Sequence, residues 1–161
     1  MNISALAVCE TEELQLRETN CAVKRVIVTL NSLGLEKDTQ IRLLGLNDVR
    51  AYDVLAGGQV SANAITTKLR ADLLNDLFDS LHEVAGSLDK VLAALFKPLP
   101  ADPLWGKSLM RVLCCSSIEK LAAIAEKAKE KEFQKLLVAG YVCANNAVSF
   151  QAAEKFKMKD R

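Results

Sequence analysis

The sequence predicts an all-α protein, in which an N-terminal helix-turn-helix unit packs against a C-terminal helical bundle. Two observations lead to this prediction. Apolar residues recur three and four positions apart along most of the chain, as on the buried face of a helix, and we find no segment with the alternation of a half-buried strand. In addition, all three prolines (Pro98, Pro100 and Pro103) lie between residues 95 and 113, so long proline-free runs flank them.

The proline segment should separate two sets of helices. Proline fixes its own φ and disfavours helical geometry in the preceding residue, so a helix that ends near Phe96 cannot continue through it. Gly106 then allows a tight bend, after which Lys107–Leu113 can form a short helix. We expect a stiff, extended connector whose Leu99, Leu104 and Trp105 pack on the surrounding helices, with Trp105 at least half buried.

The composition limits the classes of function. The chain has 161 residues, half of them apolar, which suits one domain or two small helical units sharing a core. A net charge of +1 gives no general attraction for nucleic acid. No apolar run approaches the roughly 20 residues of a membrane span, and the N-terminus lacks the basic region of a signal peptide. We therefore expect a cytoplasmic protein that does not enter a membrane.

The sequence contains no recognisable catalytic, metal or cofactor site. The five cysteines form no CxxC pair, and His82 is the only histidine, so neither a zinc site nor another metal centre is expected. We interpret the cysteines as reduced, buried small apolar residues, and His82 as a surface or half-buried helical residue. No glycine-rich phosphate-binding motif and no nucleophile–base pattern is present. An enzyme is therefore not expected.

The first 58 residues divide into an acidic N-terminal segment over 1–20, either a loosely held arm or a short helix, and a unit over 21–58 that resembles a helix-turn-helix. In the latter, one apolar helical face before Gly34 is followed by two short helices, Glu36–Leu44 and Asp48–Ala56. Gly45 ends the first short helix and Asn47 is the expected cap of the second. Two short helices joined by a tight turn are the geometry of a helix-turn-helix.

The second half is predicted to form a helical domain over 65–128 and a helical tail over 129–161. Ile65–Val84 has a clear amphipathic stripe that includes Leu69, and Ser87 is placed to cap the helix that runs into the prolines. Ser116 and Glu119 form the pattern of a capping box at the start of a further helix. The charged run Glu126–Glu132 is interpreted as the solvated end of that helix.

The helix-turn-helix suggests DNA binding, and its charges argue against it. Asn47, Arg50 and Tyr52 are the candidate DNA-binding residues, with Arg50 suited to a base edge and Tyr52 to a phosphate or sugar. Asp48 and Asp53 lie on the same helix and would repel the DNA backbone. Such units also serve as plain packing elements.

Two segments of the chain resemble the MbcA/ParS/Xre antitoxin family of bacterial toxin–antitoxin modules. The first is LNSLGLEKDTQIRLLGLNDVRAYDVLAGG at residues 30–58. The second combines LDKVLAALFKPLPADPLWGKSLMRVL at residues 88–113 with SIEKLAAIAEKA at residues 117–128. The family's usual "WL", "PN" and "SPL" motifs are replaced here, so the contacts of those motifs are not carried over.

The resemblance implies a non-catalytic protein that binds and neutralises a cognate toxin, often a RES-domain toxin that consumes NAD. It also implies a homodimer and possible repression of its own operon through operator DNA. A helical adaptor or assembly protein without DNA binding is the alternative, and an unrecognised enzyme is the third hypothesis.

The tail contains an uncharged stretch from Leu136 to Ala153 between charged flanks. Its apolar residues spread too widely around a helix axis for one buried stripe. Either the monomer encloses this helix, or a toxin or second copy covers part of it. The candidate partner-binding residues are Trp105, Lys107, Tyr141, Val142 and Phe150.

Overall fold

The computed structural model describes residues 3–59, 64–99 and 104–137, and it is all-α, as the sequence predicts. The helices in chain order are α1 (Ile3–Ser32), α2 (Lys37–Leu43), α3 (Val49–Ala56), α4 (Ala64–Ala85), α5 (Leu88–Phe96), α6 (Leu109–Cys114) and α7 (Ile118–Lys127). Residues 131–137 begin a further helical segment. Within the described ranges there is no β-strand, and a single isolated antiparallel bridge joins Pro98 to Ser108.

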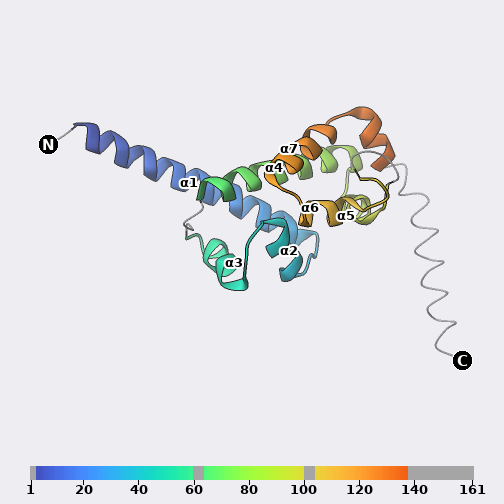
Figure 1. Cartoon of the computed structure of the whole chain (residues 1–161), viewed down its shortest axis with the longest axis horizontal. Helices are drawn as coiled ribbons and strands as arrows, with labels where there is room; N and C mark the ends of the chain where they lie inside the picture. The colour runs from blue at the N-terminus through green and yellow to red at the C-terminus, as the bar shows by residue number, and fades with distance from the viewer. Residues whose placement is uncertain (1–2, 60–63, 100–103, 138–161) are drawn as a thin grey trace, which may run out of the picture.

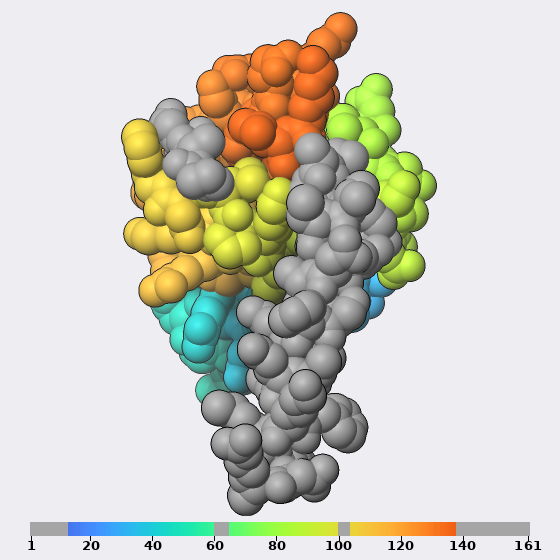
Figure 2. Space-filling model, turned by 90° about the vertical axis from the view of Figure 1, so that its right-hand side faces the viewer, coloured from blue at the N-terminus to red at the C-terminus, as the bar shows by residue number. Residues whose placement is uncertain are grey.

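Helix α4 is the centre of the architecture, because it packs against α1, α5 and α7 (Figure 1). It runs parallel to α1: Asn75 Nδ2 donates to the carbonyl of Ala22 at 3.0 Å, and further along Arg25 pairs with Asp79 at 2.6 Å. The α2–α3 pair lies to one side, where α3 contacts α1 and α2 contacts α6. In the end view, the α7 region and the α2 region lie on opposite sides of α5 (Figure 2).

Residues of both predicted units belong to one hydrophobic core. Its fully buried members include Leu30 and Leu43 from the N-terminal half and Leu74, Leu95, Leu113 and Leu121 from the C-terminal half. Leu69, which we expected on the buried stripe of α4, lies near the start of that helix and is 46% exposed. The buried apolar residues of α4 are Ala71, Leu74, Leu77, Phe78, Leu81 and Ala85.

Helix α1 is longer than predicted, because it continues without a break through residue 20. Its first half extends away from the rest of the molecule (Figure 1), and the side chains of residues 13–18 are all exposed. The first 32 residues contain neither proline nor glycine, the two residues that most disfavour a helix interior. The acidic segment is therefore the projecting end of the first helix.

Two helix caps fall one residue away from their predicted positions. Asp48, rather than Asn47, caps α3, and its carboxylate accepts a hydrogen bond from the Ala51 amide at 2.7 Å. Ser117, rather than Ser116, caps α7, and its hydroxyl accepts from the Lys120 amide at 3.3 Å. Ser116 is buried, and its hydroxyl donates to the carbonyl of Val112. Where two polar residues are adjacent, tertiary packing decides which of them becomes the cap.

The proline segment ends α5 at Phe96, and Lys97 takes extended geometry, as the sequence predicts. Leu99 and Leu104 are buried. The prediction for Trp105 was wrong, because its side chain is 71% exposed. The turn explains the difference: Gly106 N–H donates to the Leu99 carbonyl at 2.7 Å, and Lys107 N–H donates to the Leu104 carbonyl at 3.0 Å. These bonds turn Leu104 inward, and the next residue faces outward.

A buried arginine joins the N-terminal and C-terminal halves of the molecule. Arg70 lies on α4, is only 7% exposed, and donates hydrogen bonds to three backbone carbonyls. These belong to Leu43 at the end of α2 (2.5 Å), Leu113 near the end of α6 (3.0 Å) and Ser116 (2.8 Å). The last carbonyls of a helix lack intrahelical partners and carry partial negative charge. The guanidinium supplies hydrogen-bond donors to these carbonyls and a positive charge beside them.

Candidate functional site on α3 and the Trp105 turn

The orientation of α3 is set by a buried polar network on its inner side. Tyr52 is 7% exposed, and its hydroxyl donates to Gln40 Oε1 on α2 at 2.6 Å. Gln40 Nε2 donates in turn to Asn31 Oδ1 of α1 at 2.9 Å and to the Leu35 carbonyl at 2.8 Å. Because buried polar groups are costly unless paired, this network fixes α3 relative to α1 and α2.

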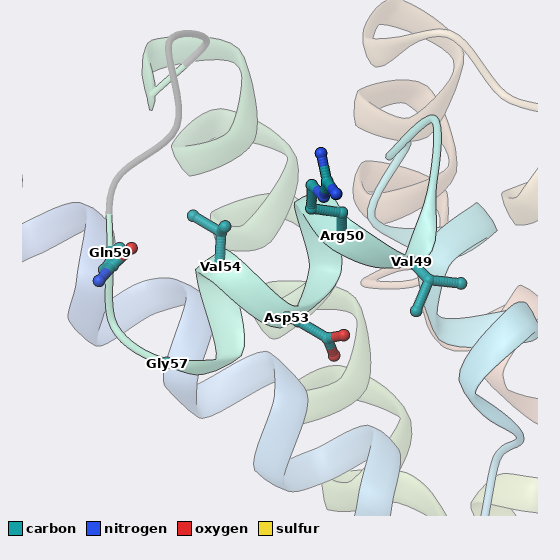
Figure 3. A pocket seen from close by; sticks show the side chains of 6 residues that line it. All are labelled: Val49, Arg50, Asp53, Val54, Gly57 and Gln59. Carbon is teal, nitrogen blue, oxygen red and sulfur yellow. The ribbon is translucent and has the colours of Figure 1, made fainter.

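The outer side of α3 borders a shallow, open hollow of about 550 Å³. Figure 3 shows Arg50 and Val54 on the same side of the helix, and Gln59 beyond the turn at Gly57. Val49 and Asp53 complete the lining. A shallow hollow suits contact with a macromolecular surface better than enclosure of a small molecule, which requires a concave pocket.

The charges around this hollow differ from what the sequence alone suggested. Asp48 is engaged as the α3 cap, and Asp53 forms an ion pair with Lys37 at 2.6 Å. Lys37 also lies 5.4 Å from the centre of the Tyr52 ring. Arg50 is exposed and has no hydrogen bond or ion pair within the described part of the chain. The acidic residues are thus partly compensated, and Arg50 is left as a cation facing solvent.

The three candidate DNA-binding residues do not share one surface. Asn47 and Arg50 are exposed at the start of α3. Tyr52 is buried and its hydroxyl is already bonded, so the role expected for it at a phosphate or sugar was wrong. Burial also raises the pKa of the Tyr52 phenol, with smaller opposing effects from Lys37 and Asp53. Residues two apart point to nearly opposite sides of a helix, so Tyr52 and Arg50 cannot both face outward. The sequence did not reveal which of the two faces the core.

The Trp105 turn is the second candidate surface. Trp105 has φ of 47°, the only positive φ of a non-glycine residue in the described ranges. A bulky side chain in this region of φ is a conformational outlier and is held there only by its surroundings. The surroundings are the bonds of Gly106 and Lys107 and the Pro98–Ser108 bridge. Lys107 is exposed beside the tryptophan.

The remaining candidate partner-binding residues, Tyr141, Val142 and Phe150, lie outside the described residues. Among the helices that are described, none combines the length and apolar character that crossing a bilayer requires. Nor do the described residues bring together three His, Cys, Asp or Glu side chains in a group that could hold a metal ion. His82 is exposed, as a surface histidine, beside a smaller hollow of about 180 Å³ between α1, α4 and α5.

The cysteines only partly match the expectation of buried thiols. Cys21 and Cys115 are exposed, whereas Cys114 is partly buried and packs against the core. Burial, together with the neighbouring Cys115, raises the pKa of the Cys114 thiol. All three are free thiols, and the side chains of Cys9 and Cys143 lie outside the part of the chain that the structure describes.

Sequence reasoning missed two buried polar residues: Gln40, which holds α3 through Tyr52, and Arg70, which joins α4 to the ends of α2 and α6. Each occurs in a helix that also has polar residues on its solvent side, so spacing alone does not mark it as buried. One signal was available at Gly45, which follows α2 with φ of 67°. A β-carbon there would lie 3.1 Å from Arg70 Nε, so glycine leaves room for the arginine.

Comparison with protein-family models, curated proteins and solved structures found no match to this chain.

Proposed function

We propose that this chain is a non-catalytic, antitoxin-like protein that binds and neutralises a cognate toxin. The observation that carries the proposal is Trp105, a large aromatic residue that is 71% exposed on a backbone with φ of 47°. Backbone strain of this kind clusters at functional sites, and tryptophan is among the residues most enriched in the energetic centres of protein interfaces. Together with the antitoxin-like segments around it, this favours toxin binding through the Trp105 turn.

The described end of this turn, residues 104–108, is suited to binding because the fold already holds it before a partner arrives. Leu99 and Leu104 anchor it in the core, and the bonds of Gly106 and Lys107 close it. Binding to a preformed surface avoids the entropic cost of ordering a loop. Phe96, at the end of α5, and Lys107, two residues after Trp105, are also exposed and offer a second aromatic ring and a cation. The expected toxin is a RES-domain protein that consumes NAD.

Growth of cells that express the product of the gene adjacent to this one tests the proposal. Co-expression of the wild-type chain should restore colony formation, and Trp105→Ala should reduce that rescue at least tenfold without lowering thermal stability. Ile65→Ala is the matched control, because Ile65 is also highly exposed but lies on α4. Absence of rescue by the wild type, or full rescue by Trp105→Ala, would contradict the proposal.

Exposed Arg50 favours a second role, autoregulation through operator DNA. With Asp48 and Asp53 engaged in a cap and an ion pair, Arg50 is available to a base edge or phosphate. Gel shifts with the chain's own upstream DNA, in the presence and absence of the toxin, should show a complex that weakens as salt rises and with Arg50→Ala. If no complex forms under either condition, the role is that of a protein-binding adaptor without DNA.

A further inference from the structure

Three cations flank the exposed aromatic rings of the Trp105 turn. Lys107 and Arg111 are exposed and Lys97 is partly exposed, while the rings of Trp105 and Phe96 are both more than half exposed. Within the described part of the chain, the charged groups of these three cations take part in no ion pair. Their charge is therefore available to a partner.

The backbone brings the three cations to one region of the surface. The antiparallel bridge between Pro98 and Ser108 sets the end of α5 beside the start of α6, and these two helices pack against each other. Paired backbones of this kind lie about 4.8 Å apart, so Lys97 and Lys107, each next to a bridged residue, belong to the same small patch. Within α6, which the structure describes throughout, Arg111 is the only exposed residue.

No described acidic residue neutralises this patch from its own segments. Residues 96–99 and 104–115 contain no aspartate or glutamate. Between positions 90 and 118 the sequence has four lysine or arginine residues and one acid, Asp102, which lies outside the described residues. The whole chain, in contrast, has a net charge of only +1. The positive charge is thus a local property of this surface.

We propose that the partner surface contacted by the Trp105 turn is acidic, with carboxylates around an apolar recess that takes the indole. This inference rests on the proposed function, because it specifies the chemistry that the same surface recognises. Charges at the rim of an interface mainly raise the association rate, whereas a well-packed aromatic anchor at its centre slows dissociation. The cations and the ring therefore have separable kinetic effects.

The number of cations favours an acidic protein over nucleic acid. Nucleic-acid affinity rises with the number of phosphates that lysine and arginine neutralise, commonly about six to ten in a bound complex. This patch offers three cations, which is enough to complement a few carboxylates on a protein surface. A large exposed tryptophan also matches the anchors of protein interfaces.

Stopped-flow association of the full-length chain with the product of the adjacent gene provides the test. Raising the salt concentration from about 0.01 to about 1 M shortens the Debye length from about 30 to about 3 Å. The association rate constant of the wild type should fall at least about tenfold over this range, because charge steering raises such rates by at least that factor. The triple variant Lys97→Gln, Lys107→Gln, Arg111→Gln should associate about tenfold more slowly at low salt and dissociate at nearly the wild-type rate.

A second triple variant, Arg17→Gln, Lys24→Gln, Lys131→Gln, is the matched control. It removes the same charge from exposed positions outside the patch, and its association rate should stay within about twofold of the wild type. Thermal melts establish that both triple variants fold. Arg111→Glu is the variant for which loss of the fold is least expected, since Ser108 Oγ accepts from the Arg111 N–H at 3.3 Å and glutamate there would complete a capping box. It too should slow association at low salt.

The outcomes separate this inference from the proposed function. Association that is insensitive to salt and to the patch triple variant, with binding still weakened by Trp105→Ala, would overturn the acidic partner surface and leave toxin binding in place. Absence of binding by the wild type would overturn both. A single-stranded oligonucleotide of about 20 nucleotides, long enough for a stacking surface and its flanking cations, is the second probe. Binding of this probe that the patch triple variant abolishes would assign the surface to nucleic acid and overturn the inference.

Discussion

Replacing Arg70 with methionine should destabilise the fold more than any single surface substitution. Arg70 donates to the carbonyls of Leu43, Leu113 and Ser116, so one side chain connects α4 to the ends of α2 and α6. Methionine fills the space of the aliphatic stem, but it has no donor and stops short of the position of the guanidinium. The substitution therefore removes the three hydrogen bonds while it keeps most of the packing of the stem.

The magnitude follows from two opposing contributions. A hydrogen bond to a charged group contributes about 1.5–3 kcal/mol, and Arg70→Met leaves three carbonyls without that partner. Against this, the burial of a guanidinium without a carboxylate costs several kcal/mol, which methionine does not incur. Burial likewise lowers the pKa of Arg70. We expect a net loss of about 3 kcal/mol, a large part of the typical stability of a domain.

Urea denaturation followed by circular dichroism measures this loss. The midpoint should fall while the slope of free energy against urea stays the same, because the fold itself is unchanged. Arg70→Lys should recover only part of the stability, since a single ammonium cannot reach three carbonyls as a planar guanidinium does. Arg111→Met, at an exposed arginine of α6, is the control and should be nearly neutral. Equal stability of Arg70→Met and the wild type would refute the role assigned to the buried arginine.

Three further outcomes follow from the same contacts. In thermal melts, Gly45→Ala should destabilise the fold more than Gly34→Ala. Both glycines have positive φ, but only at Gly45 does the added β-carbon meet Arg70, so equal losses of stability would contradict this reasoning. Tyr52→Phe should cost about 1–2 kcal/mol in urea denaturation by leaving Gln40 Oε1 unpaired, and a neutral effect would show that the network does not hold α3. At neutral pH, iodoacetamide should modify exposed Cys21 and Cys115 before Cys114, because the raised pKa of the Cys114 thiol lowers its thiolate fraction. Mass spectrometry of timed samples measures the order of modification, and faster modification of Cys114 would contradict its partial burial.

The positions of most helices could be predicted, because the residues that end a helix act on the backbone next to them. The prolines after Phe96 and the glycines at residues 34, 45 and 86 end helices whatever the rest of the chain does. The exact caps could not be predicted, since Asn47 and Asp48 are adjacent and both are good caps. Packing of α3 against α1 decides between them, and packing depends on residues distant in sequence.

The candidate site was harder to predict, because its side-chain directions depend on the tertiary structure. A lone tryptophan among leucines is usually buried, and only the bonds that close the turn at Gly106 place Leu104 inward and Trp105 outward. Tyr52 and Arg50 are two residues apart, so knowing which one faces α2 requires the position of Gln40. The partners of Arg70 are backbone carbonyls 27 to 46 residues away, which no side-chain pattern records.

Calorimetric titration of the purified chain with the product of the adjacent gene tests the proposed function most directly. The wild type should bind with a saturable heat signal, Trp105→Ala should weaken the affinity at least tenfold, and Arg50→Ala should leave it unchanged. Binding that is equally strong with Trp105→Ala, or no binding by the wild type, would contradict an antitoxin that acts through the Trp105 turn.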